Sequence, residues 1–183
     1  MCGIVGWARP GKADESAQKR LNAMCDTIIH RGPDDRGQFI SDGIALGMQR
    51  LSIVDITGGH QPMSSEDGQI LIVFNGEIFN HSALREAEIN RGGSFQSRSD
   101  TEVILRLYER FGTSCVDLLN GMFAIAIWDG RHQTLHLLRD RLGVKPLYWR
   151  FKDGELVFAS EINAILASSP DAGDTVITER LDY

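Results

Sequence analysis

The apolar run Ile70-Leu71-Ile72-Val73-Phe74 decides the fold class, because no polar residue interrupts it. A strand with one face in water alternates apolar and polar residues, whereas a strand covered on both faces is apolar throughout. The run therefore predicts a sheet strand that is covered by other layers on both sides.

Further along the chain, two pairs of strand-like runs flank short turns. Residues 122–128 and 134–138 flank the turn 129–133, and residues 147–151 and 155–159 flank the turn Lys152-Asp153-Gly154. Short apolar runs joined by glycine-containing turns predict antiparallel β-hairpins. All three tryptophans lie in strand-like runs, and we expect each to be a core or sheet-covering residue: Trp7, Trp128 and Trp149.

Fewer segments have helical periodicity. Apolar residues recur at helical spacing over residues 17–28 and again over 103–111, and residues 162–167 predict a third, short helix. The stretch Ser99-Asp100-Thr101-Glu102 predicts a capping box at the start of the second helix, with Ser99 and Glu102 exchanging hydrogen bonds. Hairpins with helices between them indicate an α+β domain in which helices cover the sheets.

Length, charge and cysteine content narrow the class of protein. The 183 residues suit one domain, and 19 basic against 25 acidic side chains give a net charge of −6. This acidic balance argues against a nucleic-acid or anionic membrane partner, and no apolar run approaches the roughly 20 residues that span a bilayer. Three cysteines are too few and too uneven for a disulfide scaffold, so we predict a cytoplasmic protein.

The cysteine at position 2 has the chemistry of a nucleophile. Removal of the initiator methionine would leave Cys2 with both a thiol and a free α-amine. A free α-amine has a reference pKa near 8, so it can accept the thiol proton close to neutral pH. From Met1-Cys2-Gly3 alone, the competing interpretation is a small buried cysteine beside an N-terminal strand.

Cys2 is followed by a series of motifs that occur in a fixed order: His30-Arg31-Gly32-Pro33-Asp34, Gln49-Arg50-Leu51-Ser52-Ile53-Val54-Asp55, Gln61-Pro62-Met63, Asn75-Gly76-Glu77-Ile78-Phe79-Asn80, Ser99-Asp100 and Arg139-Asp140-Arg141-Leu142-Gly143-Val144-Lys145-Pro146-Leu147-Tyr148. From residue 2 to about residue 167 the chain closely resembles the N-terminal glutaminase domain of glutamine-dependent asparagine synthetases, which are class II glutamine amidotransferases. One such motif would be weak evidence, but six in order behind a cysteine at position 2 are specific.

This resemblance implies a fold, an activity and a set of site residues. The implied fold is the N-terminal nucleophile hydrolase type, a four-layer αββα sandwich with two mainly antiparallel sheets between helices. The implied activity is hydrolysis of glutamine to glutamate and ammonia through a γ-glutamyl thioester on Cys2. The implied catalytic residues are Cys2, Asn75 and Gly76. The implied glutamine-binding residues are Arg50, Leu51, Ile53, Val54, Gly76, Glu77 and Asp100.

The residue types fit these roles, although each also has a simpler explanation. The Asn75 amide and the Gly76 N–H suit an oxyanion, but Asn-Gly alone is typical of a hairpin turn. The planar fork of Arg50 suits the glutamine α-carboxylate, and the alternative is a salt bridge on an edge strand. Asp100, helped by Glu77, suits the α-ammonium; an acid in a first helical turn is also favoured by the helix dipole, although Ser99 already explains the cap.

By this resemblance we expect residues 2–183 to be an amidotransferase domain shortened at its C-terminal end. The ATP-pyrophosphatase domain of asparagine synthetases is expected to be absent, since no Ser-Gly-Gly phosphate loop occurs. The glutaminase half needs no metal or cofactor, whereas ATP and Mg²⁺ would serve the synthetase half. The expected partners are glutamine and a synthetase domain that takes up ammonia and amidates aspartate, with a homodimer as an open alternative.

Three other functions stay open. A glutaminase-like domain can be kept as a catalytically silent docking or regulatory module. A different class II amidotransferase would make an amino sugar or a purine precursor, and an asparagine-synthetase-like enzyme can act on an acceptor other than aspartate.

Overall fold

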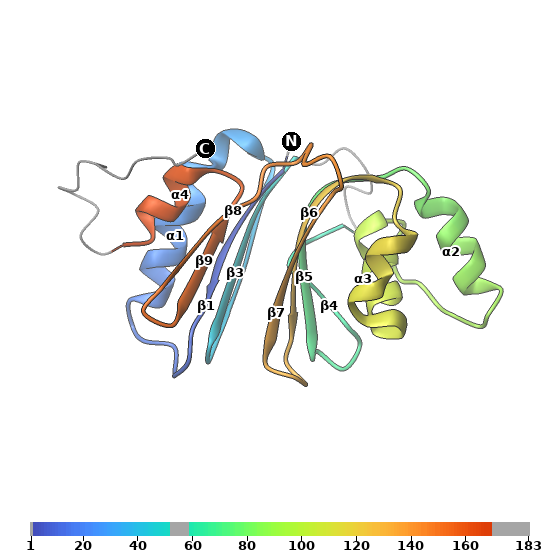
Figure 1. The fold of residues 1–183 in the computed structure, drawn as a ribbon, viewed down its shortest axis with the longest axis horizontal. Coiled ribbons are helices and arrows are strands. Elements are labelled where there is room, and N and C mark those ends of the chain that lie inside the picture. The colour runs from blue at the N-terminus through green and yellow to red at the C-terminus, as the bar shows by residue number, and fades with distance from the viewer. Residues whose placement is uncertain (1, 52–58, 170–183) are drawn as a thin grey trace.

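Two antiparallel sheets lie face to face between two layers of helices in the computed structural model, which describes residues 2–51 and 59–169 (Figure 1). The first sheet has the strand order β2-β3-β1-β9-β8. Its strands are β1 (Gly3–Ala8), β2 (Asp35–Ser41), β3 (Ile44–Arg50), β8 (Tyr148–Lys152) and β9 (Glu155–Ala159). The second sheet has the order β4-β5-β6-β7. Its strands are β4 (Met63–Ser64), β5 (Ile70–Ile78), β6 (Gly121–Asp129) and β7 (Thr134–Arg139).

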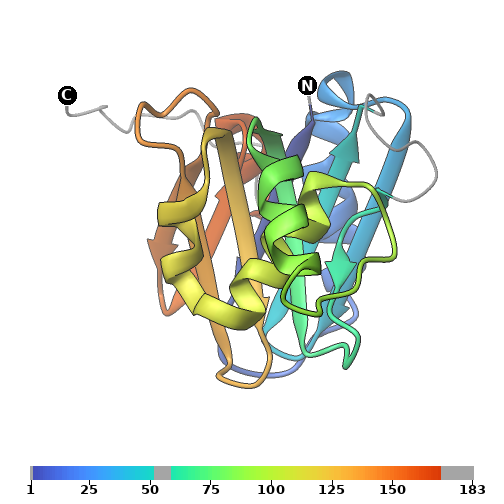
Figure 2. The same cartoon turned by 90° about the vertical axis from the view of Figure 1, so that its right-hand side faces the viewer.

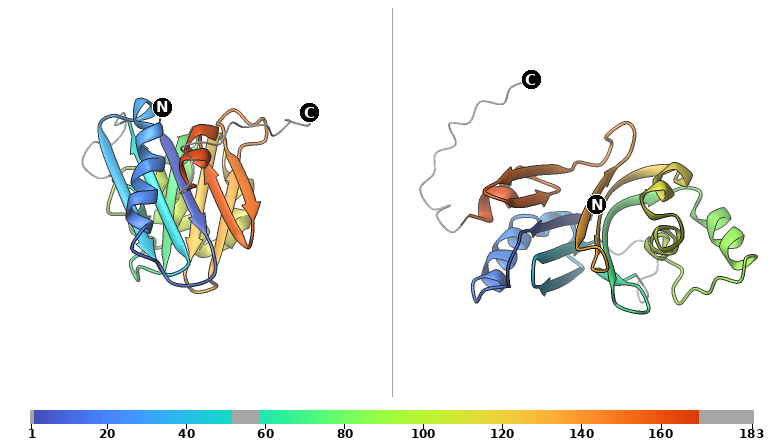
Figure 3. Two further views of the ribbon diagram at one scale, coloured as in Figure 1. Left: turned by 90° about the vertical axis from the view of Figure 1, so that its left-hand side faces the viewer. Right: turned by 60° about the horizontal axis from the view of Figure 1, so that its bottom comes forward.

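Helices cover the outer face of each sheet. The first sheet is covered by α1 (Ala17–Thr27) and α4 (Ile162–Ala167), as the left view of Figure 3 shows. On the second sheet lies α3 (Asp100–Phe111), with α2 (His81–Ile89) beside it (Figure 2). Two 3₁₀ segments, η1 (Ile29–Arg31) and η2 (Gly112–Leu118), follow α1 and α3. The predicted αββα order of layers is therefore present.

The apolar run of β5 is covered on both faces, as its sequence predicts. Leu71 and Val73 pack between the two sheets, against residues such as Met48 and Phe158. The alternate residues of the run face α3 and belong to the core between that helix and the second sheet: Ile70, Ile72 and Phe74. Strand alternation thus makes one segment the centre of two hydrophobic layers.

Both predicted hairpins form, between β6 and β7 and between β8 and β9. The tryptophan prediction is right for Trp7 and Trp128 but wrong for Trp149, which is 64% exposed. Trp149 lies on β8, the edge strand of the first sheet, and the described elements leave its side chain open to solvent. Among the described residues, no helix is both long and apolar enough to cross a membrane.

The capping box predicted before α3 forms only in part. The Ser99 side chain caps the helix, but it accepts from the N–H of Thr101 at 3.1 Å. The Glu102 carboxylate instead accepts from the N–H groups of Gln96 and Ser97, at 2.8 and 2.6 Å. Glu102 is buried, and its carboxylate is paired with these loop N–H groups and with Arg106 at 3.8 Å rather than with the Ser99 backbone.

Candidate active site

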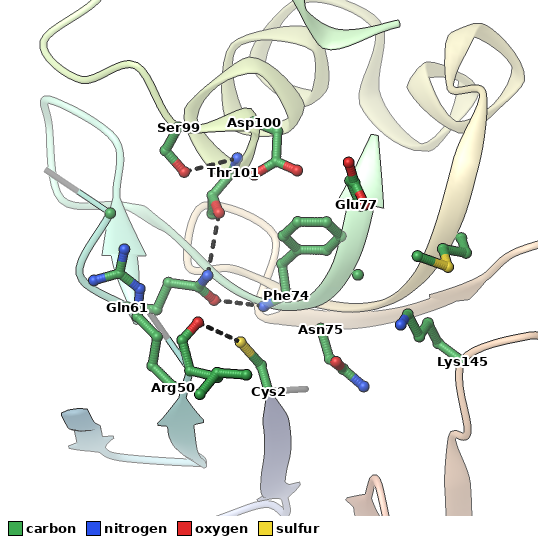
Figure 4. A pocket seen from close by; sticks show the side chains of 14 residues that line it. Cys2, Arg50, Gln61, Phe74, Asn75, Glu77, Ser99, Asp100, Thr101 and Lys145 are labelled. Carbon is green, nitrogen blue, oxygen red and sulfur yellow. Dashed lines mark hydrogen bonds between the residues drawn. The ribbon is translucent and has the colours of Figure 1, made fainter. Parts of the chain in front are cut away.

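The three most distinctive site residues lie on facing strands at one end of the sandwich. Strand alternation puts Cys2 on the same face as Ile4, and Arg50 on the same face as Met48. Asn75 lies on the same face of β5 as Val73. Ile4, Met48 and Val73 all belong to the core between the sheets, so the three polar side chains point into the same layer. Figure 4 shows them around one cavity.

The residue expected to be the nucleophile is held by its backbone. The guanidinium Nε of Arg31 donates to the Cys2 carbonyl at 3.1 Å, and Arg31 also pairs with Glu161 at 2.9 Å. Two residues further along the chain, in β1, the Ile4 N–H donates to the buried Ser160 hydroxyl at 3.0 Å. The Cys2 Sγ is 3.8 Å from the carbonyl oxygen of Leu51. The backbone of Cys2 is therefore held in place. The residue is only half-buried, so it is still accessible.

Asn75 provides a buried amide beside this thiol. Its side chain is 1% exposed, and its Nδ2 has no hydrogen-bond partner among the described residues. A buried amide donor without a partner costs free energy, and this one borders the cavity, where a bound molecule could accept its hydrogen bond. Next to it, Gly76 packs so tightly that a Cβ would lie 2.2 Å from the Met122 carbonyl oxygen. The backbone at position 76 therefore tolerates only glycine.

Two carboxylates border the opposite side of the cavity. Asp100, in the first turn of α3, accepts from the Ile78 N–H at 3.2 Å, which ties the helix to the end of β5. Burial raises the pKa of the Asp100 carboxyl, and the hydrogen bond from Ile78 lowers it by less. Glu77 lines the same cavity but is exposed. Arg50 is 5% exposed, which puts a guanidinium within the same enclosed space.

The cavity has a volume of about 220 Å³, which suits one small polar molecule rather than a drug-sized ligand. Of the residues expected from the sequence, it brings together Cys2, Arg50, Leu51, Asn75, Gly76, Glu77 and Asp100. Ile53 and Val54, also expected in the site, lie outside the described residues. Across the described ranges, no group of three or more His, Cys, Asp or Glu side chains could hold a metal ion.

The cavity is also lined by residues that were not predicted to be part of the glutamine site. They are Gly59, Gln61, Phe74, Ser99, Thr101, Met122 and Lys145. Three of them carried a signal, because Gln61, Ser99 and Lys145 lie inside motifs of the ordered series. Lys145 is 5% exposed and brings an ammonium group to the same side of the cavity as Asn75 (Figure 4).

The loop that presents Lys145 is organised by one carboxylate. Asp140 is buried, and its two oxygens accept four backbone N–H groups, from Phe123, Leu142, Val144 and Lys145, at 2.8–3.2 Å. Burial alone would raise the pKa of Asp140, but these hydrogen bonds outweigh it and hold the pKa below its ordinary value of 3.8. A depressed pKa means that the ionised carboxylate stabilises the fold.

Replacing Asp140 by Asn should lower the free energy of unfolding at pH 7 by about 2 kcal/mol, because an amide NH₂ would face two donors. Because the pKa of Asp140 is lower in the folded than in the unfolded protein, the extra stability of the wild type is fully present above the unfolded-state pKa. It is lost as the pH falls through the folded-state pKa. Denaturant unfolding of both proteins between pH 7 and pH 3 measures this. An advantage that does not shrink on acidification would contradict the assigned role.

With this geometry in hand, comparison with known proteins gives a family. The profile of the family described as glutamine amidotransferase domain matches residues 1–181. The chain belongs to this family. The ordered motifs therefore indicated the right class of domain.

The amidotransferase domain has relatives among asparagine synthetases. It is 42% identical over 169 residues to the glutamine-hydrolyzing asparagine synthetase 3 of Bacillus subtilis, covering 91% of this chain and 28% of that protein. A putative glutamine-hydrolyzing asparagine synthetase of Methanocaldococcus jannaschii is 42% identical over 186 residues, covering 91% and 35%. The amidase chyE of Penicillium rubens is 38% identical over 178 residues, covering 91% and 26%. The chain thus spans about a third or less of these relatives.

Solved structures support the fold of the domain. Glutamine phosphoribosylpyrophosphate amidotransferase from B. subtilis, in complex with ADP and GMP, superposes with a TM-score of 0.76 at 22% identity, covering 91% of this chain and 43% of that one. A second structure, described as the allosteric regulatory enzyme of purine biosynthesis, gives a TM-score of 0.75. The predicted N-terminal nucleophile hydrolase fold is confirmed by these likenesses.

Proposed function

We propose that this domain hydrolyses the side-chain amide of glutamine, with Cys2 as the nucleophile. The observation that carries the proposal is the buried Asn75 amide, whose Nδ2 has no partner within the described part of the chain and which borders the Cys2 cavity. A donor kept ready beside a nucleophile is what a tetrahedral oxyanion requires. A purely structural asparagine would have its donor satisfied.

The proposed reaction begins with proton transfer from the Cys2 thiol to the α-amine of the same residue. The thiolate attacks the side-chain amide carbon of glutamine. The amide oxygen becomes an oxyanion, which accepts hydrogen bonds from the Asn75 side chain and the Gly76 N–H. The protonated amine then gives its proton to the departing nitrogen, which leaves as ammonia. A water molecule cleaves the remaining γ-glutamyl thioester, releasing glutamate and restoring the thiol.

The other end of glutamine would be held by charge. Arg50 offers a planar fork that matches the α-carboxylate, and Asp100 offers a carboxylate for the α-ammonium. Glu77 would add a second, more exposed negative charge on the same side. For these contacts we also propose a contribution from the backbone around Leu51, Ile53 and Val54.

We further propose that ammonia passes to a synthetase domain, where ATP and Mg²⁺ activate aspartate or a related carboxylate for amidation. The similarity to asparagine synthetases over 90% of this chain favours aspartate. The similarity to the Penicillium amidase keeps other acceptors open.

All three cysteines are free thiols, which is consistent with a location in the cytoplasm.

A direct assay tests the proposed hydrolysis. The full-length protein is incubated with glutamine, and glutamate and ammonia are measured together. We expect the two products in equal amounts, and much less hydrolysis of asparagine, because a side chain shorter by one methylene would not reach Cys2 while its charged end is held. A correctly folded protein that releases neither product would refute the proposal.

Replacing Asp100 by Asn should raise the KM for glutamine about 10- to 100-fold, since a charged hydrogen bond is worth about 1.5–3 kcal/mol. Because burial raises the Asp100 pKa, the wild-type KM should already increase on acidification above the ordinary titration range of an aspartate. The Asn variant should lack this pH dependence. It should also be more stable at neutral pH, where the wild type holds a desolvated carboxylate. An unchanged KM would contradict the assignment.

A further inference from the structure

Gln61 is a buried side chain in the cavity whose function the proposed reaction does not use. It is 7% exposed, and both of its polar atoms are hydrogen bonded (Figure 4). Its Oε1 accepts from the Phe74 N–H at 2.6 Å, and its Nε2 donates to the Thr101 hydroxyl at 3.1 Å. Gln61 therefore joins two elements that are separate in the sequence, β5 and α3.

The two bonds end beside the groups that would hold opposite ends of the substrate. Phe74 directly precedes Asn75 and Gly76, whereas Thr101 directly follows Asp100. The amide of Gln61 thus bridges the backbone that carries the proposed oxyanion donors and the helical turn that carries the proposed ammonium acceptor. A change in this bridge would alter the spacing between the two ends of the site.

The Gln61 bridge lies just beyond the point where the pairing of β4 with β5 ends. Strand β4 pairs with β5 at Met63↔Ile72, and the same register continued would pair residue 61 with Phe74. Position 61 lies before β4 begins, and its side chain rather than its backbone accepts from Phe74. The Gln61 side chain thus supplies the acceptor that the Phe74 N–H needs. Its Nε2 also donates to Thr101 of α3, a bond that a backbone carbonyl could not make.

The backbone of Gln61 is held from the opposite direction by β2. A Cβ placed on Gly37 would lie 1.5 Å from the Gln61 carbonyl oxygen, so the segment sits directly on this strand. Main chain and side chain are both restrained, which makes Gln61 a rigid spacer rather than an adaptable contact. Rigid support around reacting groups is what preorganised sites require, because a misplacement of about 1 Å can cost about 100-fold in rate.

We propose that Gln61 is a positioning residue for glutamine hydrolysis, fixing the distance between the Asn75–Gly76 backbone and Asp100. This inference rests on the function proposed above. It predicts that the residue affects reaction with glutamine and its analogues far more than the reactivity of the Cys2 thiol itself.

The test compares two isosteric variants in the full-length protein, Gln61→Met and Gln49→Met. Gln49 is the matched control, a buried glutamine on β3 whose Nε2 donates to the Cys25 carbonyl at 3.1 Å, outside the cavity. Cys2 is alkylated either by iodoacetamide, which needs only the thiol, or by the glutamine-like electrophile diazo-oxo-norleucine, which needs the whole site. Peptide masses assign the label to Cys2.

For Gln61→Met we expect about a tenfold rise in the KM for glutamine and a similar fall in the rate of labelling by diazo-oxo-norleucine. Labelling by iodoacetamide should stay within twofold of the wild type. Gln49→Met should leave the ratio of the two labelling rates unchanged. A Gln61→Met protein with the wild-type KM and the wild-type ratio would overturn the inference.

A milder pair of variants covers the case in which Gln61→Met does not fold. Thr101→Val removes only the acceptor of the Gln61 Nε2, and Thr101→Ser restores a hydroxyl at the same place. We expect the first to raise the KM and lower the labelling ratio, and the second to rescue both. Equal ratios in the two variants would reduce Gln61 to a structural role. If the wild type itself reacts with neither glutamine nor the analogue, the proposed function falls first, and this inference with it.

Discussion

Replacing Cys2 by Ala is expected to lower the rate of glutamine hydrolysis at least about 1,000-fold, because it removes the thiol on which the proposed covalent intermediate forms. The thiol stands at the start of β1, and the cavity lining around it contains no second cysteine. Glutamate release by the purified variant measures the effect. Residual activity of more than a few per cent would contradict the role of Cys2.

The matched control for this variant is Cys115→Ala. Cys115 is a buried free thiol in η2, within the core between α3 and the second sheet. Burial raises the pKa of its thiol to about 11, so it stays protonated at neutral pH and cannot act as a nucleophile. We expect this variant to keep its activity and to lose only a modest amount of stability.

The proposed role of the α-amine has a separate test. A variant with one extra residue in front of Cys2 keeps the thiol but moves the free amine away from it. We expect iodoacetamide still to label Cys2, while turnover of glutamine falls by at least about 100-fold, the lower range for loss of a positioned acid–base group. Intact mass shows whether the initiator methionine has been removed in each preparation. Full turnover with a blocked amine would assign the proton transfer to another group.

Replacing Asn75 by Ala is expected to reduce kcat by about 100- to 1,000-fold, since one oxyanion donor contributes about 3–4 kcal/mol in comparable sites. The KM should change little, because the donor acts on charge that develops after binding. Asn75→Asp should be at least as damaging, since it puts an acceptor where the donor was. Steady-state kinetics with glutamine distinguish these changes from a loss of binding.

Asn80→Ala is the control for the Asn75 variants. Asn80 lies five residues further on, and its amide is fully used by backbone groups: Nδ2 donates to the Leu118 carbonyl, and Oδ1 accepts from the Asn120 N–H, both at 2.9 Å. Its loss should lower the melting temperature without a comparable fall in kcat. If both variants lose activity only in proportion to their stability, Asn75 has no catalytic role.

Much of the fold could be predicted because its central segments have strong patterns. The continuous apolar run of β5 and the glycine turns of two hairpins are local signals, and the structure uses each of them as expected. No helix was predicted at α2, because Glu88 is its only buried residue and no apolar stripe marks it. No strand was predicted at β2, since every residue is partly or fully exposed and the pattern does not alternate.

The reacting and binding residues of the site could be predicted, but the contacts that hold them in place could not. Cys2, Arg50, Asn75 and Asp100 come from four distant segments, and only the resemblance of the ordered motifs linked them before the structure did. Ser99 was predicted as a helix cap, and its hydrogen bond to Thr101 agrees with that prediction. The bridging role of Gln61 depends on two contacts 13 and 40 residues away, which no local pattern reveals.

The central claim is that Cys2 attacks the side-chain amide of glutamine, and one labelling measurement tests it most directly. The full-length protein is treated with diazo-oxo-norleucine, with and without excess glutamine, and the adduct is located by peptide mass. The predicted result is a single adduct on Cys2 that forms with loss of glutaminase activity and is prevented by glutamine. An adduct on another residue, or no adduct on a folded protein from which Met1 has been removed, would contradict the claim.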